Sequence, residues 1–171
     1  MTNNNLTAPS NSLAGRGAGN DTLIGGGSTN ILVGGEGDDL LIGGNGRDIL
    51  IGGIGSDVLK AGKGDDILIA GNTDYDANDV ALHSILAEWN STRDYMTRVN
   101  NILNGSGSTN RLNGNYFFNA TDVHDDGVKD TETGGKGRDW FFANIDGDHG
   151  AKVDKITDKA GNEIVTDINF V

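Results

Sequence analysis

The chain has 171 residues, with 25 acidic side chains against 13 basic ones and a formal net charge of −12. This negative balance disfavours nucleic acids and anionic membranes as partners and favours cations. The lack of cysteine excludes disulfides, thiol catalysis and thiolate metal sites.

Residues 1–15 are rich in Asn, Ser and Thr and include the only proline, Pro9. They lack the basic start and apolar stretch of a secretory signal peptide. No later segment approaches the roughly 20 apolar residues of a transmembrane helix. We predict a polar N-terminal tail that, if ordered, pairs along the following repeats or with a neighbouring molecule.

A nine-residue unit runs six times in succession from Arg16 to Ile69, and a seventh copy begins at Ala70. The unit has two glycines or near-glycines, any residue, Gly, any residue, Asp and a three-residue apolar run. The eighth position is always leucine: Leu23, Leu32, Leu41, Leu50, Leu59 and Leu68. The sixth position is aspartate in every copy except the second, which has Asn30.

The unit predicts a short strand followed by a sharp turn. Three apolar residues form a strand too short to be stable alone, and glycines accept the positive φ of tight turns. Stacked turns would present rows of carbonyl and carboxylate oxygens, which are the ligands of Ca²⁺. Without the cation the aspartates repel one another and the glycine-rich chain has much entropy to lose. We therefore predict that Ca²⁺ folds residues 16–73.

The unit resembles the G-G-x-G-x-D-x-U-x pattern of the RTX, or hemolysin-type, calcium-binding repeat family. The resemblance implies a right-handed parallel β-roll, a β-solenoid in which two nonapeptides make one coil. Copies n and n+2 would then stack and share a Ca²⁺ ion. It also implies export by type I secretion machinery.

The same resemblance implies the metal ligands. At the sixth position they are Asp21, Asn30, Asp39, Asp48, Asp57 and Asp66. Carbonyl ligands would come from the second and fourth glycines, Gly35, Gly37, Gly44, Gly46, Gly53, Gly55, Gly62 and Gly64. Ser28 and Asn30 in copy two, and Thr73 in copy seven, depart from the pattern. We therefore expect roughly three to five ions.

The two-repeat period divides the strands between two sheets with different outer faces. The even copies show a β-branched array outward: Ile31, Val33, Ile49, Ile51, Ile67 and Ile69. An apolar face of this kind needs a cover. The candidates are the C-terminal half of this chain and a second copy of the protein.

Residues 74–103 change to a helical period. Their apolar residues are Val80, Leu82, Ile85, Leu86, Trp89, Met96, Val99 and Leu103. Asp76 and Asn78 are capping candidates, and Asn90-Ser91-Thr92 divides the segment into two helices. We expect this helical insert to lie against a sheet of the roll.

Residues 104–171 are predicted to form a C-terminal α+β cap. Residues 134–142 are a displaced eighth nonapeptide whose Asp139 would complete a Ca²⁺ site and whose aromatic ending would close the core. Residues 122–133 match an EF-hand loop in part, the alternative being a solvated acidic loop. Residues 152–171 alternate like a hairpin. The final Asp167–Val171 resembles a type I secretion signal.

Catalysis has little support, because the three histidines are scattered and no metalloprotease or serine-hydrolase motif is present. We predict a secreted, non-enzymatic Ca²⁺-binding protein, extracellular or at the cell surface, with a structural role. Self-assembly through the roll ends and the apolar face would make a homo-oligomer or filament. The alternative is the C-terminal domain of a larger adhesin or extracellular enzyme.

Overall fold

The computed structural model describes residues 3–9, 12–147 and 150–168. Its main feature is a pair of six-stranded parallel sheets, here called the odd sheet and the even sheet. The odd sheet contains, in spatial order, β1 (Asn5–Thr7), β3 (Thr22–Gly26), β5 (Leu40–Asn45), β7 (Val58–Lys63), β11 (Thr131–Lys136) and β13 (Lys155–Ile156). The even sheet contains β2 (Leu13–Ala18), β4 (Ile31–Glu36), β6 (Ile49–Ile54), β8 (Ile67–Ile69), β12 (Trp140–Ala143) and β14 (Ile164–Asp167).

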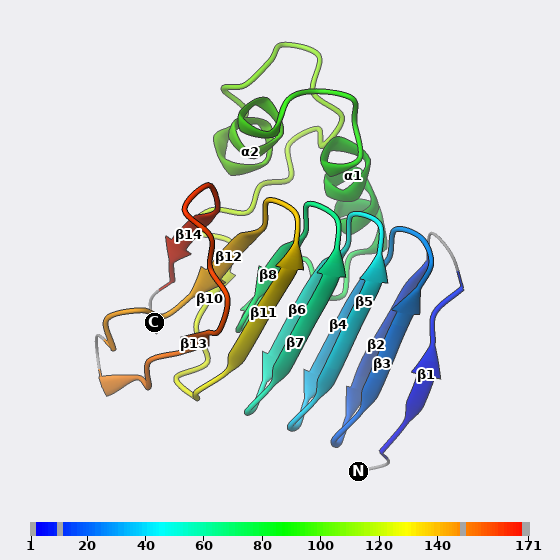
Figure 1. Cartoon of the computed structure of the whole chain (residues 1–171), viewed down its shortest axis with the longest axis vertical. Coiled ribbons are helices and arrows are strands. Elements are labelled where there is room, and N and C mark those ends of the chain that lie inside the picture. The colour runs from blue at the N-terminus through cyan, green and yellow to red at the C-terminus, as the bar shows by residue number, and fades with distance from the viewer. Residues whose placement is uncertain (1–2, 10–11, 148–149, 169–171) are drawn as a thin grey trace.

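Strands pair with the strand two repeats away, so the chain changes sheet at every turn. Ile31 pairs with Ile49, and Ile49 with Ile67, in parallel register. Figure 1 shows the resulting coils stacked in one row, with the helices gathered at one side. This arrangement confirms the predicted parallel β-roll with two nonapeptides per coil.

The eighth-position side chains fill the space between the two sheets. All six repeat leucines lie there in one buried cluster with Phe141 of β12. Burying one leucine side chain contributes about 1.5–3 kcal/mol. The column therefore holds the sheets together, and each turn is fixed in position relative to the next.

Two helices cover the outer face of the even sheet. They are α1 (Asp79–Trp89) and α2 (Tyr95–Asn104), separated where the sequence predicted a break. The isoleucines of β4, β6 and β8 form one buried cluster with Leu82, Ile85, Trp89, Val99, Ile102 and Phe118. The chain's own C-terminal half therefore covers the apolar face, rather than a second copy. A filament contact through this face would require the helices to leave it.

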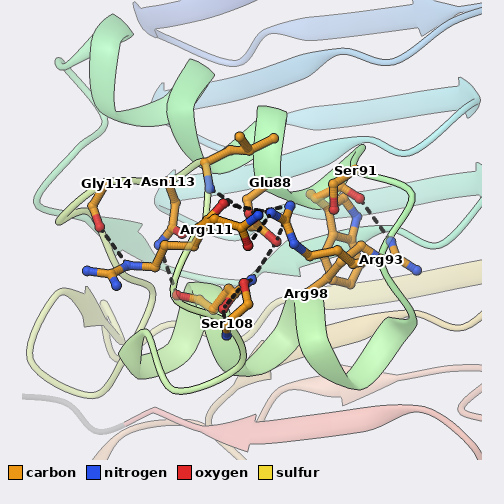
Figure 2. Close-up of polar contacts among 12 residues, drawn as sticks. Glu88, Ser91, Arg93, Arg98, Ser108, Arg111, Asn113 and Gly114 are labelled. Carbon is orange, nitrogen blue, oxygen red and sulfur yellow. Dashed lines mark hydrogen bonds and ion pairs between the residues drawn. The ribbon is translucent and has the colours of Figure 1, made fainter.

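Buried Glu88 holds the helices and the following loop together. Its carboxylate accepts hydrogen bonds from Asn101 Nδ2 and the Leu112 amide, each at 2.7 Å, and pairs with Arg93 Nη1 at 3.2 Å. Figure 2 shows these contacts joining both helices to residues 105–114. The paired Glu88 carboxylate thus holds the polar loop against both helices.

The roll extends beyond the recognisable repeats at both ends. Within the predicted polar tail, β1 pairs with β3 and β2 pairs with β4, so part of this segment forms additional strands. After the insert, a short antiparallel ladder joins β9 (Asn72–Thr73) to β10 (Val123–His124) before the roll resumes. None of the helices among the described residues is long and apolar enough to span a bilayer.

The prediction of a hairpin near the C-terminus is wrong. β13 pairs in parallel with β11, and β14 pairs in parallel with β12 in the opposite sheet. The two strands therefore add one more coil to the roll. Alternating apolar residues predict a strand but not its partner, and here each partner is an earlier strand of the roll.

Candidate calcium sites in the turns

The fold stacks the sixth-position residues into two rows, one before each sheet. The row before the odd sheet contains Asp21, Asp39, Asp57, Asp130 and Asp154, and the other contains Asn30, Asp48, Asp66 and Asp139. All six sixth-position residues predicted from the repeats, together with Asp139, lie in these rows. Asp130 and Asp154 are members that the sequence analysis did not assign, because the glycines and the leucine of their repeats are missing.

One carboxylate oxygen of each aspartate binds the backbone of the preceding turn in its row. Asp57 Oδ1 accepts the Asp39 N–H at 2.7 Å, and Asp66 Oδ1 accepts the Asp48 N–H at 2.7 Å. Asp139 Oδ1 accepts the Asp66 N–H at 2.9 Å, which places the displaced eighth repeat directly after the sixth. Each aspartate therefore joins two turns that are one coil apart.

The second carboxylate oxygen is buried and has no hydrogen-bond partner. This holds for Oδ2 of Asp39, Asp48, Asp57, Asp66, Asp130 and Asp139. Leaving an ionised carboxylate buried without a partner costs far more than a typical hydrogen bond contributes. The same unpaired oxygen recurs at the same place in successive turns, so these residues fit a cation held between the turns.

First-position glycines lie beside these oxygens. A Cβ on Gly52 would lie 2.5 Å from both the Asp57 Oδ2 atom and the Ala70 carbonyl oxygen. A Cβ on Gly34 would meet Asp39 Oδ2 and the Gly52 carbonyl at 2.3 Å. The space is thus bordered by a carboxylate of one turn and a carbonyl of the next coil, a donor set suited to Ca²⁺. The sequence analysis named second- and fourth-position glycines and missed this position, although glycine fills it in four of the six copies.

The eight predicted carbonyl ligands share one backbone feature. Gly35, Gly37, Gly44, Gly46, Gly53, Gly55, Gly62 and Gly64 all have φ between 106° and 137°. Side chains rarely adopt this conformation, so the turn itself requires glycine at both positions. Their role as ligands remains a prediction, since the close approach of the backbones already explains these residues.

Burial raises the pKa of the sixth-position carboxyls. The pKa of Asp39 rises to about 6, that of Asp48 to about 7, and those of Asp57 and Asp66 to about 8. Desolvation is the largest cause, and the hydrogen bond from the preceding turn opposes it in each case. Near neutral pH, Asp57 and Asp66 would hold a proton unless a cation took its place.

The N-terminal positions of both rows differ from the rest. Asp21 Oδ1 accepts the Asn4 N–H at 2.6 Å, and the Asn4 amide contacts both carboxylate oxygens. Asn30 is neutral, and its Nδ2 donates to the Ser28 carbonyl. Asn4, directly before the added strand β1, therefore satisfies Asp21 in part, and Asn30 contributes no charge. These two positions are the least suited to hold Ca²⁺.

The partial EF-hand match does not gather its acids at one point. Asp126 Oδ2 accepts the Gly55 N–H at 2.7 Å, while Asp130 Oδ1 accepts the Asp57 N–H at 2.6 Å. Across the described residues, no three acidic or histidine side chains converge closely enough to form a metal site by themselves. An ion in the turns would therefore need backbone carbonyls as well as carboxylates.

Comparison with known families supports the calcium assignment. Residues 17–41 and 42–74 match the family model described as RTX calcium-binding nonapeptide repeat (4 copies). Residues 17–74 of the roll are RTX repeats. Searches of curated proteins and of solved structures found no match. The repeat family is calcium-binding, so Ca²⁺ is the cation that the unpaired oxygens of this RTX roll fit.

The helical cap contacts one of the two rows directly. Trp89 Nε1 donates to the Asp65 carbonyl at 2.6 Å, and the Tyr95 hydroxyl donates to the Asp139 carbonyl at 2.9 Å. Buried Arg98 pairs with the Asp65 carboxylate at 2.5 Å. The cap and the turns before the even sheet thus share polar contacts, which the helical period alone did not predict.

Proposed function

We propose that this RTX protein folds when Ca²⁺ occupies its turns after export, and that it then serves outside the cell as a non-enzymatic structural component. The observation that carries the proposal is the repeated buried carboxylate oxygen without a partner. These oxygens make the empty roll unfavourable at neutral pH and the calcium-bound roll favourable.

The mechanism is a linkage between ion binding and folding. An ion held between turns n and n+2 neutralises two stacked carboxylates and replaces their repulsion with shared coordination. At a free Ca²⁺ concentration about 100 times the Kd, each site adds about 2.7 kcal/mol to the stability of the folded state. The low free Ca²⁺ inside a cell would leave the chain unfolded and suited to type I export.

The non-enzymatic part of the proposal draws on how the histidines are used. His124 Nε2 contacts Asp74 Oδ1 at 2.9 Å, and His83 Nδ1 contacts the Asp79 carbonyl within α1. The first contact joins residues 50 apart in the chain, and the second lies within one helical turn, so both histidines make structural contacts. Of the predicted secretion signal, Asn169–Val171 lie outside the described residues, so export remains part of the proposal.

The test is a calcium titration of the full chain. Far-UV circular dichroism in a chelator should show an unfolded spectrum at pH 7.5–8, and millimolar Ca²⁺ should produce strand signal. Calorimetry on the same sample should count several ions. Strand content that is the same with and without Ca²⁺ would refute calcium-driven folding.

A further inference from the structure

Three arginines gather where the helical cap meets the turns before the even sheet. Arg47 and Arg138 occupy the fifth position of their repeats, and Arg98 belongs to α2. Arg47 Nη1 and Arg98 Nη1 both donate to the Trp89 carbonyl, at 3.3 Å and 2.9 Å. Arg98 and Arg138 both lie against the Tyr95 ring, with Cζ atoms 5.6 Å and 4.0 Å from its centroid. The three guanidinium groups, here called the arginine cluster, are therefore neighbours.

The arginine cluster shares a single acid, Asp65. Its Oδ2 pairs with Arg98 Nη2 at 2.5 Å and lies 3.9 Å from Arg47 Nε, while its Oδ1 accepts the backbone N–H of Arg138 at 3.1 Å. No other ion pair among the described residues involves the cluster. Three positive charges thus share one negative charge, within a chain whose formal net charge is −12.

The remaining acids close to the cluster belong to the calcium turns. Burial lowers the pKa of Arg47 and the charge of Arg98 lowers it further, whereas Asp65 and Asp66 oppose this change. Asp139 follows Arg138 directly and lies in the same row as Asp66. An ion between those two carboxylates would neutralise them, so the cluster keeps its positive charge in the calcium-bound roll. In this respect the inference rests on the proposed function.

Two members of the cluster can reach a ligand from solvent. The Arg138 guanidinium is partly exposed and makes no hydrogen bond or ion pair to any described side chain, and its Nε is unpaired. The Arg47 side chain is 33 % exposed, and its Nη1 is the only nitrogen of the group that donates a hydrogen bond within the described chain. Arg98 is 2 % exposed and contributes its charge from the interior.

We propose that the arginine cluster binds a sulfate group at the surface where the cap meets the roll. Arg138 and Arg47 donate N–H groups to the sulfate oxygens in charge-assisted hydrogen bonds. Arg98 raises the positive potential beneath the site, held in place by Asp65 and the Trp89 carbonyl. Free sulfate carries two negative charges, which equal the excess of three arginines over one aspartate.

The choice of sulfate follows from the donors. A guanidinium group only donates hydrogen bonds, so the site favours an anion that has no proton of its own. Phosphate keeps a proton part of the time near neutral pH and would need an acceptor for it. Both oxygens of Asp65 are already engaged. Free sulfate and a sulfate ester of a polysaccharide share the required chemistry, and the experiment separates these two sources.

The experiment titrates sodium sulfate into the full chain by calorimetry, in Ca²⁺ that saturates the roll and at constant ionic strength. Arg138→Gln removes the charge, and Arg138→Lys keeps the charge but loses the two-pronged donor. Lys60→Gln, at an exposed position of β7 in the odd sheet, is the control for loss of one positive charge. Circular dichroism confirms that each variant is folded. Dextran sulfate and unsulfated dextran are titrated in parallel.

We expect the wild type to bind one sulfate, and Arg138→Gln to weaken this binding by roughly tenfold or more. Arg138→Lys should lose less, and Lys60→Gln should stay within about twofold of the wild type. Dextran sulfate that binds more tightly than free sulfate, through Arg138, identifies the ester as the source. Binding of free sulfate alone identifies the ion.

A folded wild type that binds neither free sulfate nor dextran sulfate overturns the inference. Equal affinities of Arg138→Gln and Lys60→Gln also overturn it, because sulfate would then respond only to overall charge. These results would leave calcium-driven folding untouched. A chain that folds without Ca²⁺ would instead refute the proposed function, and the same titration of that folded chain would still decide the sulfate site.

Discussion

The carboxylate of Asp57 accepts the backbone N–H of Asp39, 18 residues earlier, at 2.7 Å, and its other oxygen is buried without a partner. One side chain thus both sets the spacing of two coils and offers an oxygen to an ion between them. The hydrogen bond persists only while the coils are stacked. On the proposed function, ion binding and coil stacking are therefore coupled at this residue.

Replacing Asp57 with Asn should weaken calcium binding more than its loss of charge explains. The amide can still accept the Asp39 N–H, but it offers a weaker ligand to the cation. We expect at least a tenfold rise in the Ca²⁺ concentration at half-maximal folding, a change of about 1.4 kcal/mol. Circular dichroism during a calcium titration measures this concentration. Glu36→Gln is the matched control, and an equal shift in that variant would indicate a general charge effect.

Gly55→Ala should destabilise the calcium-bound roll by about 2 kcal/mol or more. Gly55 has φ 129°, and an added Cβ would lie 2.3 Å from the Gly37 carbonyl oxygen. Urea denaturation in saturating Ca²⁺ would give the free energy of unfolding. Gly27→Ala is the control, since a Cβ there meets nothing within 4 Å. Equal stability of the two variants would contradict the close stacking of the turns.

Without Ca²⁺, acid should favour the folded roll. The pKa values of Asp48, Asp57 and Asp66 rise from the ordinary 3.8 to about 7, 8 and 8 in the folded state. A raised folded pKa gives stability that is complete below pH 3.8 and is lost as the pH rises through 7 to 8. We expect more strand signal in chelator at pH 5 than at pH 8.

Protons should compete with Ca²⁺ for the same oxygens of the folded roll. The apparent Kd of Ca²⁺ for the folded roll should therefore rise as the pH falls from 8 to 5. Calorimetric calcium titrations at both pH values would measure this Kd. A Kd that does not change with pH would show that the buried carboxylates are not the ligands.

Glu88→Ala should loosen the helical cap at a cost of about 3–5 kcal/mol. The change leaves Arg93, the Asn101 amide and the Leu112 N–H without their shared acceptor. Hydrogen exchange of α1 and α2 would report the loss, because the helices would open more often. Val80→Ala, at a position 67 % exposed on α1, is the control. Unchanged exchange in Glu88→Ala would mean that apolar packing alone holds the cap.

The sequence alone predicted much of the fold, because in this chain the period of the residues and the period of the structure coincide. A leucine in every ninth place requires a continuous inner column, and an aspartate in every ninth place requires two rows of carboxylates. The covering of the even sheet also followed from its apolar outer face. The change of period over residues 74–103 predicted the helices, since helical spacing is a local property.

Only the tertiary structure decided which distant strands pair with each other. Thr131-Glu132-Thr133 has neither the glycines nor the leucine of a repeat, and its place in the roll is visible only from its pairing with β7. The C-terminal strands alternate like a hairpin, yet each joins an earlier strand. The alternation of residues along a strand predicts which face is buried. The strand with which it pairs depends on which sheet edge of the roll is free. Glu132 lies in the roll for that reason, and no local pattern could have placed it there.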